Sequence, residues 1–314
     1  MERKFKQYLE SKGYSIESID GYCRDVFSYI EWCESEGLES EQSTYRDVLG
    51  YVQHLKQRGL KPRSVQKYIT SLKHYFRWLV KLGVLGSNPI SKLNIQGIQR
   101  NVLYHILSKA TMERLYEEYG ESTVGRAPTP RGQEGSERQN WYQASQLTQK
   151  RNKVMLGLMI WQGLGSSELG ALTVQDLKLR EGKIYVAGNR RSNERILKLE
   201  AHQVLDLMEY TMQTRPELLK LSGVESEQLF LSTRGKGRFS NMITELMKQL
   251  RAMNHQVENT KQLRASVITY WLKVHNLRQV QYMAGHRYIS STEAYQVNDL
   301  EGLQEDISKY HPIN

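Results

Sequence analysis

The chain is poor in cysteine and in long apolar runs. Only Cys23 and Cys33 among its 314 residues are cysteines, and both fall inside one segment with helical spacing. Two thiols on one predicted helix argue against a disulfide framework and against a thiolate zinc site. No apolar run approaches the roughly 20 residues of a membrane-spanning helix, and residues 1–4 lead directly into an amphipathic pattern without a signal peptide. We therefore expect a protein of the reducing cytoplasm that does not associate with membranes.

Basic residues outnumber acidic ones. The net charge is +10 and the isoelectric point is about 9.4, whereas the contents of hydrophobic residues (39%) and charged residues (25%) are ordinary. A basic excess of this size favours a polyanion as partner, and a merely basic protein without such a partner is the alternative. The length is sufficient for two domains, each with its own hydrophobic core.

Residues 1–92 are expected to form a helical domain. Helical spacing recurs over residues 15–37, 44–57 and 62–83, with a capping residue or a proline at the start and a glycine near the end of several segments. A proline breaks the pattern after the last of these segments, and no sustained period follows it. Residues 93–105 are therefore predicted to be an interdomain linker.

The last of these segments presents two different faces. Residues 61–81 contain six basic residues and no acidic residue, and apolar side chains occupy the side opposite to the charges. At about 100° per residue, five basic side chains fall within one arc of roughly 120°. Such a face suits contact with DNA phosphates, although a solvated lysine face is the alternative. The residues on this arc are Arg63, Lys67, Lys73, Arg77 and Lys81.

Residues 106–314 are expected to form a second domain that is mainly helical around a small antiparallel sheet. A glycine- and proline-rich surface loop is predicted for residues 120–138, and a buried helix for residues 147–162. Short alternating segments predict strands, and a basic loop at residues 188–193 joins the last two. The predicted strands cover residues 176–179, 183–187 and 195–199.

An ordered set of motifs runs through this second domain. Gly163-Leu164 is followed by Ser167-Glu168-Leu169, then by the basic hairpin, Lys261-x-x-Arg264, Gly285-His286 and Ser291-Thr292-x-x-Tyr295. Together with Arg63-Ser64-Val65-Gln66-Lys67 and Asn88-Pro89 in the first domain, this set resembles the tyrosine recombinase (phage integrase) family in its Xer-like form. The resemblance covers essentially the whole chain. It implies a SAM-like helical core-binding domain and a catalytic domain that together clamp duplex DNA.

The resemblance also implies the chemistry. A tyrosine, here Tyr295, attacks the scissile phosphate and forms a 3′-phosphotyrosyl link, so neither a cofactor nor a metal is required. Arg264 would hold nonbridging oxygens with its planar guanidinium, and His286 would donate to the phosphate. Lys261, three residues before Arg264 on the same predicted helix face, would handle a proton or contact phosphate. Tyr295 is expected at the start of a helix.

Two positions depart from the family pattern. The family's first catalytic arginine corresponds to Gly165, which has no side-chain donor, and the loss of one such donor costs about 10²–10³ in rate. Arg287 and Arg191 are candidates to substitute for it. The hairpin has no lysine at its tip, so Arg190 is assigned to the leaving oxygen, where it would act through its charge because arginine does not readily release a proton. A hairpin tip that only grips a backbone phosphate, through Arg190 or Arg191, is the alternative.

We therefore expect a site-specific recombinase that binds double-stranded DNA in the nucleoid. The alternatives are a DNA-binding relative with weakened or lost cleavage, and a purely helical DNA-binding regulator. The resemblance implies a homotetramer on two DNA sites, assembled through a C-terminal helix that is lent to a neighbour or packs within its own chain. The apolar residues of that segment are Leu300, Leu303, Ile307 and Tyr310.

Overall fold

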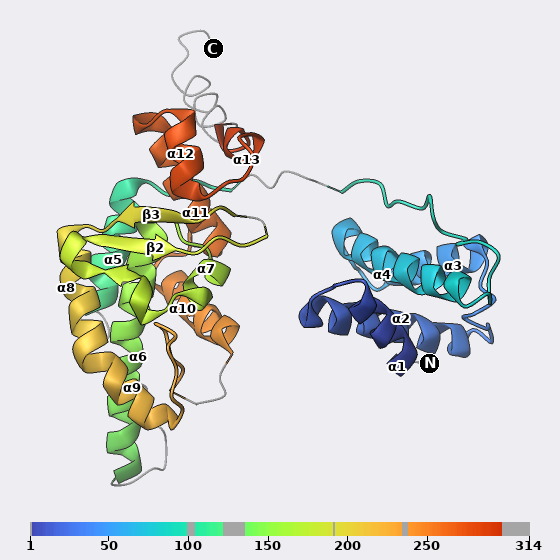
Figure 1. The fold of residues 1–314 in the computed structure, drawn as a ribbon, viewed down its shortest axis with the longest axis horizontal. Coiled ribbons are helices and arrows are strands. Elements are labelled where there is room, and N and C mark those ends of the chain that lie inside the picture. Colours follow the sequence, from blue (N-terminus) through green and yellow to red (C-terminus); the bar gives the residue numbers. More distant parts are fainter. Residues whose placement is uncertain (1, 99–103, 122–135, 191, 234–237, 297–314) are drawn as a thin grey trace. The chain divides into compact units, whose positions relative to one another are not determined.

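The computed structural model describes residues 2–98, 104–121, 136–190, 192–233 and 238–296 (Figure 1). The chain forms two compact units, residues 1–102 and 103–314, and each unit has its own buried core. Helices dominate both units, and the second unit contains a three-stranded antiparallel sheet. These features confirm the predicted fold class. None of the described helices is both long enough and apolar enough to cross a membrane.

The first unit is a helical bundle whose helix starts follow local capping rules. Ser15 accepts a hydrogen bond from the Ser18 amide at 3.4 Å, and Thr44 forms a capping box with Asp47. Pro62 occupies the first turn of its helix, where a missing N–H costs nothing. The four helices are α1 (Glu2–Ser11), α2 (Ile16–Ser35), α3 (Tyr45–Gln57) and α4 (Pro62–Lys81).

Part of the predicted linker packs against this bundle. Leu93 and Ile95 contact the first core, and the Ile95 amide donates to the Gln66 side chain at 2.7 Å. Residues 99–103 of the linker lie outside the described residues. The linker bounds stay a prediction.

The basic face of α4 is less uniform than its sequence suggests. Lys67 donates to the buried carboxylate of Asp25 on α2 at 2.9 Å, so this charge of the basic face has an acidic partner although residues 61–81 contain no acidic residue. The partner comes from another helix and cannot be seen in the α4 sequence. Lys73 donates to Asn94 at 3.3 Å, and Lys81 lies over the Tyr8 ring. Arg63 and Arg77 are exposed.

In the second unit several helices pack against α6 (Ser136–Ile160), and the sheet lies near the C-terminal end of that helix (Figure 1). The strands are β1 (Leu177–Lys178), β2 (Lys183–Val186) and β3 (Arg195–Lys198), in the order β1-β2-β3. A π-helical turn at Tyr210–Thr214 joins α8 to α9. The helices are α5 (Lys109–Glu121), α6 (Ser136–Ile160), α7 (Ser166–Ala171), α8 (Ala201–Glu209), α9 (Arg215–Ser222), α10 (Phe239–Met253), α11 (Thr260–Val274), α12 (Leu277–Ala284) and α13 (Ser290–Glu293).

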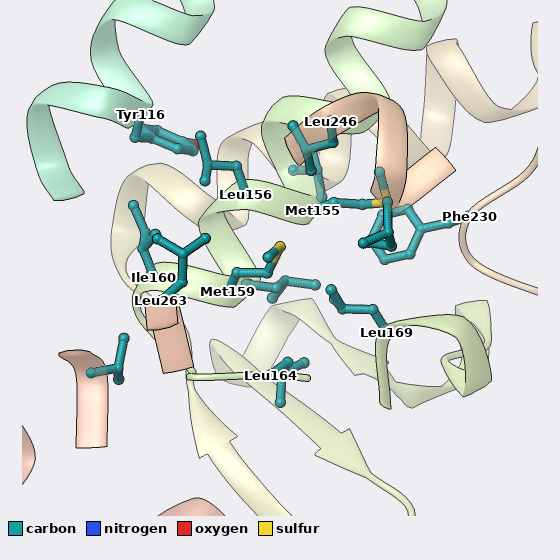
Figure 2. Packing of buried hydrophobic residues seen from close by; sticks show 14 of the residues in the cluster. Tyr116, Met155, Leu156, Met159, Ile160, Leu164, Leu169, Phe230, Leu246 and Leu263 are labelled. Carbon is teal, nitrogen blue, oxygen red and sulfur yellow. The ribbon is translucent and has the colours of Figure 1, made fainter. Parts of the chain in front are cut away.

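The apolar part of α6 lies at the centre of the second core. Met155 and Met159 are essentially unexposed, and Figure 2 shows Met155 beside Leu246 and Phe230 from other elements. The helix begins at Ser136, so the prediction that it starts near residue 147 is wrong. Its first turns lack the apolar spacing on which the prediction relied. Of the surface loop predicted for residues 120–138, residues 122–135 lie outside the described residues.

The pairing between α2 and α4 leads to a stability prediction. Asp25 is buried and also accepts from the Ser71 hydroxyl at 2.7 Å. Asp25→Ala removes this hydrogen bond and the pair with Lys67, and leaves the Ser71 hydroxyl only its bond to the Lys67 carbonyl at 3.2 Å. We expect a loss of about 1–3 kcal/mol in the free energy of unfolding. The matched control is Asp20→Ala, which removes an exposed pair with Lys6 and should cost at most about 1 kcal/mol.

Hydrogen exchange of the α4 amides in the full-length chain measures the difference in stability between Asp25→Ala and Asp20→Ala. Equal exchange rates in the two variants would contradict the stabilising role of the buried carboxylate.

Candidate active site

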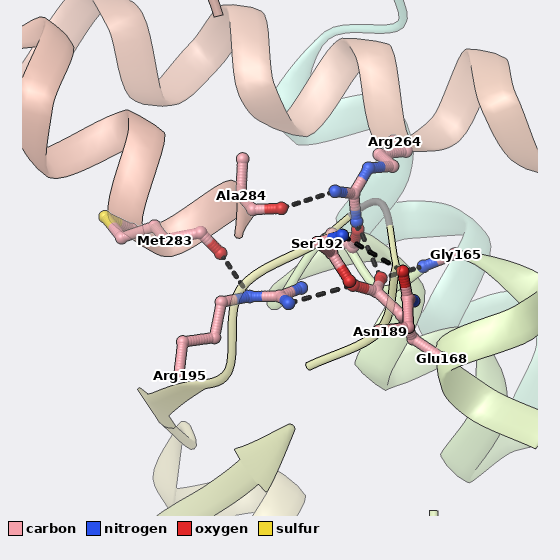
Figure 3. A network of polar contacts seen from close by, with 9 residues as sticks. Gly165, Glu168, Asn189, Ser192, Arg195, Arg264, Met283 and Ala284 are labelled. Carbon is pink, nitrogen blue, oxygen red and sulfur yellow. Dashed lines mark hydrogen bonds and ion pairs between the residues drawn. The ribbon is translucent and has the colours of Figure 1, made fainter. Parts of the chain in front are cut away.

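A buried carboxylate joins two arginines that are far apart in the sequence. Glu168 lies in the first turn of α7, where its Oε2 accepts from the Gly165 amide at 2.9 Å and caps the helix. Oε1 accepts from Arg195 Nη1 and Oε2 from Arg264 Nη1, both at 2.8 Å (Figure 3). Only 7% of the carboxylate side chain is exposed. One acidic side chain therefore orients two guanidinium groups.

Arg264 is held from three sides. It projects from the second turn of α11, a helix that begins where the Asn259 side chain accepts from the amides of Lys261 and Gln262. Besides Glu168, its guanidinium donates to the carbonyl of Gly163 at 2.6 Å and to that of Ala284 at 2.5 Å. The side chain stays 16% exposed. A guanidinium fixed in this way is preorganised to bind an anion at its exposed edge.

Arg195 is the site residue that the sequence analysis missed. It opens β3, where residues alternate between buried and exposed, and its side chain is 0% exposed. Nε donates to the Met283 carbonyl at 2.8 Å, while Nη2 has no hydrogen-bond partner among the described residues. The signal was present in the sequence, because Leu197 faces the core and places Arg195, two residues earlier, on the same side.

The hairpin between β2 and β3 contacts the end of α12. The Asn193 amide donates to the Gly285 carbonyl at 2.9 Å, and Ser192 forms an isolated bridge with His286. Gly285 has φ of 69°, a conformation that favours glycine, and it ends α12. A Cβ on Gly285 would overlap Nη1 of Arg195 and lie 2.9 Å from its Cζ. Both the backbone and the buried arginine therefore require glycine here.

His286 and Tyr295 lie together. Their rings are stacked, with centroids 5.7 Å apart and planes at 11°. His286 Nδ1 is 2.9 Å from the hydroxyl of buried Thr292, which fixes the imidazole orientation. Tyr295 is partly buried in the turn that follows α13 and lies directly before Gln296, which is helical. The residues after Gln296 lie outside the described ones, so the expectation that Tyr295 starts a helix stays a prediction. The short α13 lies between His286 and Tyr295 and returns the chain toward the histidine.

The other predicted site residues that the structure describes are more exposed to solvent than Arg264 and His286. Lys261 is exposed in the first turn of α11, and Arg190 is exposed near the hairpin tip. Arg191 lies outside the described residues. Arg287 is exposed and donates to the Asn189 carbonyl of the hairpin at 3.3 Å.

Gly165 occupies an ordinary backbone conformation. Its φ of −81° and ψ of 163° are accessible to any residue. A Cβ there would meet only Glu168 Oε2, at 3.6 Å. An arginine is thus compatible with this backbone, and its absence does not follow from steric exclusion at the Cβ position.

Burial and neighbouring charges set the protonation states. Burial alone would raise the pKa of Glu168, but the charges of Arg264 and Arg195 together hold it below its ordinary value. Burial, Arg264 and Arg195 lower the pKa of His286 to about 4. At neutral pH the site therefore contains an ionised carboxylate between two arginines and a neutral imidazole.

Comparison with known proteins identifies the family of the chain. The profile of the phage integrase family matches residues 134–301, and that of the phage integrase N-terminal SAM-like domain matches residues 3–83. The chain belongs to the phage integrase family. It is a tyrosine recombinase family enzyme, as the sequence motifs predicted. The alternative of a purely helical regulator is contradicted by this membership and by the sheet.

Relatives align over nearly the full length of this phage integrase family member. Tyrosine recombinase XerC of Oceanobacillus iheyensis is 27% identical over 98% of this chain and 94% of its own length. Tyrosine recombinase XerD of Listeria innocua is 26% identical over 97% and 95%.

Solved structures share the fold. XerH site-specific recombinase bound to palindromic difH substrate has a TM-score of 0.68 at 17% identity, covering 98% of this chain and 84% of that one. A lambda integrase tetramer bound to a Holliday junction has a TM-score of 0.61 at 14% identity, covering 93% and 75%.

The overlap at Gly285 can be tested against a matched glycine. Gly223 has φ of 64° and open space around its Cβ position, so Gly223→Ala carries only the strain of the left-handed conformation, about 1–2 kcal/mol. Gly285→Ala should lose a further ~1–3 kcal/mol in unfolding free energy because it displaces Arg195. Urea unfolding of both variants measures the difference, and equal losses would contradict the contact.

The imidazole of His286 should stay neutral in the DNA-free protein down to about pH 5. An unfolded histidine binds its proton near pH ~6.5, and the folded one only near 4. Stability should therefore decline as pH falls between these values. NMR titration of ¹³C-labelled histidine, assigned with His286→Gln, measures the midpoint. A midpoint near the ordinary value would contradict the influence of burial and of the two arginines.

Proposed function

We propose that this recombinase cleaves and rejoins DNA strands with Tyr295 as the nucleophile. The phenolic oxygen attacks the scissile phosphorus, a 3′-phosphotyrosyl bond forms, and the 5′-hydroxyl leaves. Attack by the 5′-hydroxyl of a partner strand reverses the step, so the phosphodiester bond energy is retained. The observation that carries the proposal is the stacking of Tyr295 on His286, while Arg264 donates to the carbonyl of Ala284, two residues before that histidine.

Arg264 and His286 would stabilise the charge that builds on the phosphate. The role of Arg264 is supported by its fixed, partly exposed guanidinium, a group suited to nonbridging oxygens. The role of His286 is supported by the contact of its Nδ1 with Thr292. If the threonine hydroxyl donates to Nδ1, the neutral imidazole carries its proton on Nε2 and donates it to the phosphate.

Lys261 and Arg190 would act at the edges of the same phosphate. Lys261 is one turn before Arg264 on α11, where it can contact phosphate or handle a proton. Arg190, on the exposed hairpin, would stabilise the leaving 5′-oxygen by its charge. A general acid of the lysine type is absent from the hairpin sequence, residues 188–193.

Residues 1–92 and 106–314 would clamp duplex DNA, with residues 93–105 as the linker. On the first of these domains, α4 would contact phosphates through Arg63, Lys67, Lys73, Arg77 and Lys81, and Arg191 would add a contact from the hairpin. Arg63 and Arg77 support this role because their side chains are exposed. Lys67 would do so while bound to Asp25.

A homotetramer on two DNA sites would bring the partner strands together. The proposal is supported by the similarity to a lambda integrase tetramer bound to a Holliday junction. The segment that would link the subunits, with Leu300, Leu303, Ile307 and Tyr310, lies outside the described residues.

The second candidate function is a DNA-binding relative whose cleavage is weakened or lost. Gly165 favours this alternative, since it removes a guanidinium donor that the family places beside the phosphate. Such a protein would bind DNA with a salt dependence set by its phosphate contacts and form no covalent product.

Covalent trapping separates the two functions. The substrate is DNA containing the recombination junction mapped in vivo, with a bridging sulfur at the 5′ position of the scissile phosphate. The 5′-thiol that leaves does not religate efficiently, so a covalent protein–DNA complex should accumulate. Tyr295→Phe should abolish the complex. The matched control Tyr288→Phe changes a tyrosine that is 71% exposed and should leave the yield unchanged.

The location of the bond can be read directly. Peptide mapping of the trapped complex should find the nucleotide on Tyr295. Salt-dependent binding without any covalent complex would support the second candidate function. A complex that persists in Tyr295→Phe would assign the nucleophile to another residue.

A further inference from the structure

Gly165 leaves a charge problem at the proposed phosphate site. Glu168 and Arg264 form an ion pair at 2.8 Å, and one negative and one positive charge sum to zero. A phosphate placed at the exposed edge of Arg264 would therefore also experience the carboxylate behind that guanidinium. The ion pair is neutral, so it presents a net charge of +1 to an anion only if a second cation lies close to Glu168.

Arg195 is that second cation. Its Nη1 lies 2.8 Å from the other oxygen of the same carboxylate, so the three side chains together carry a net charge of +1. The group is 0% exposed, and solvent therefore screens its charge far less than that of a surface arginine. Glu168 is the one carboxylate paired with Arg195 within the described part of the chain.

The fold holds this arginine in one place. Its Nε donates to Met283 at the end of α12, and Gly285 leaves the space that Nη1 occupies. Nη2 is buried without a hydrogen-bond partner among the described residues, an arrangement that costs stability. An apolar residue at this buried position of β3 would be expected to give an equal or higher free energy of unfolding, because well-packed apolar groups can often replace buried ion pairs.

Arg287, one of the two arginines considered from the sequence, is less suited to this task. Arg287 is exposed, and its guanidinium donates to the Asn189 carbonyl. Arg191 lies outside the described residues. Arg287 is not paired with Glu168 in the described structure, whereas Arg195 is.

We propose that Arg195 is a positioning residue that offsets the charge of Glu168, so that Arg264 presents its full positive charge to the scissile phosphate although Gly165 supplies none. This inference rests on the proposed strand cleavage. Arg195 acts through Glu168 and Arg264, and it does not touch the DNA.

The proposal predicts an unusual pH dependence. In Arg195→Gln the carboxylate of Glu168 faces only Arg264. Its negative charge then weakens the attraction between Arg264 and the scissile phosphate. Protonation of Glu168 at lower pH removes that charge, so cleavage by this variant should recover as the pH falls. The groups that face Glu168 are Arg264 from α11, Arg195 from β3 and the imidazole of His286 after α12.

His286 would also gain a positive charge in acid, and a second variant separates the two effects. In Arg195→Gln/Glu168→Gln the carboxylate is already neutral. The new amide oxygen can accept from the Gly165 amide and Arg264, while its NH₂ faces the glutamine at position 195. This double variant should cleave faster than Arg195→Gln at neutral pH and should lack the recovery that depends on Glu168.

The experiment is single-turnover formation of the covalent complex on the bridging-phosphorothioate DNA with the full-length protein. Arg195→Gln should be slower by about 10²-fold, and Arg195→Lys, which keeps the charge, should lose less. Gly165→Arg should accelerate Arg195→Gln more than it accelerates the unchanged protein. The matched control is Arg151→Gln, which removes another buried arginine, on α6, and should leave the cleavage rate of folded protein unchanged.

The outcomes distinguish the inference from the proposed function. If the unchanged protein forms no covalent complex, strand cleavage itself is wrong and the role of Arg195 falls with it. If the unchanged protein cleaves and Arg195→Gln cleaves equally fast, only the role of Arg195 is overturned. The role of Arg195 is also overturned if the double variant cleaves as slowly as Arg195→Gln. It is likewise overturned if Arg287→Ala, and not Arg195→Gln, abolishes cleavage.

Misfolding of Arg195→Gln does not remove the test. Arg195→Lys retains a cation, and the double variant leaves no unpaired carboxylate, so both report on the charge in folded protein. A double variant that folds and cleaves slowly at every pH would overturn the inference.

Discussion

The arrangement of the site depends on one buried carboxylate. Glu168 caps α7 through the Gly165 amide and accepts hydrogen bonds from Arg195 on β3 and Arg264 on α11. The same two arginines donate to carbonyls near the end of α12, where His286 follows. Four elements, α7, β3, α11 and α12, are thereby fixed against each other. A displacement of the carboxylate would move both guanidinium groups at once.

Charge explains why such a costly cluster is retained in the core of a DNA-processing enzyme. Burial penalises all three ions, and the two cations hold the pKa of Glu168 low enough to keep it ionised. Burial and the same two cations hold the pKa of His286 near 4. The protein thus keeps a neutral imidazole beside a positive cluster, an environment suited to binding a phosphate diester and to donating a hydrogen bond to it.

Local rules made most of the fold predictable. The caps at Ser15 and Thr44 and the alternation in the strands are short-range signals, and the helices and the sheet formed where these signals lie. Prediction failed where partners come from elsewhere in the chain. Lys67 pairs with Asp25, 42 residues away, and Arg195 pairs with Glu168, 27 residues away. No periodicity within one element reports such a pairing.

The amino-acid sequence alone determined the family, the two-domain organisation and the identity of Tyr295, Arg264 and His286 as site candidates, because motif order and helical spacing are properties of the linear chain. Only the tertiary structure decided that Tyr295 stacks on His286 and that Arg195 shares the carboxylate of Glu168. The physical reason is that burial and charge pairing depend on distances through space, and those distances exist only after the sheet, α7, α11 and α12 have packed together.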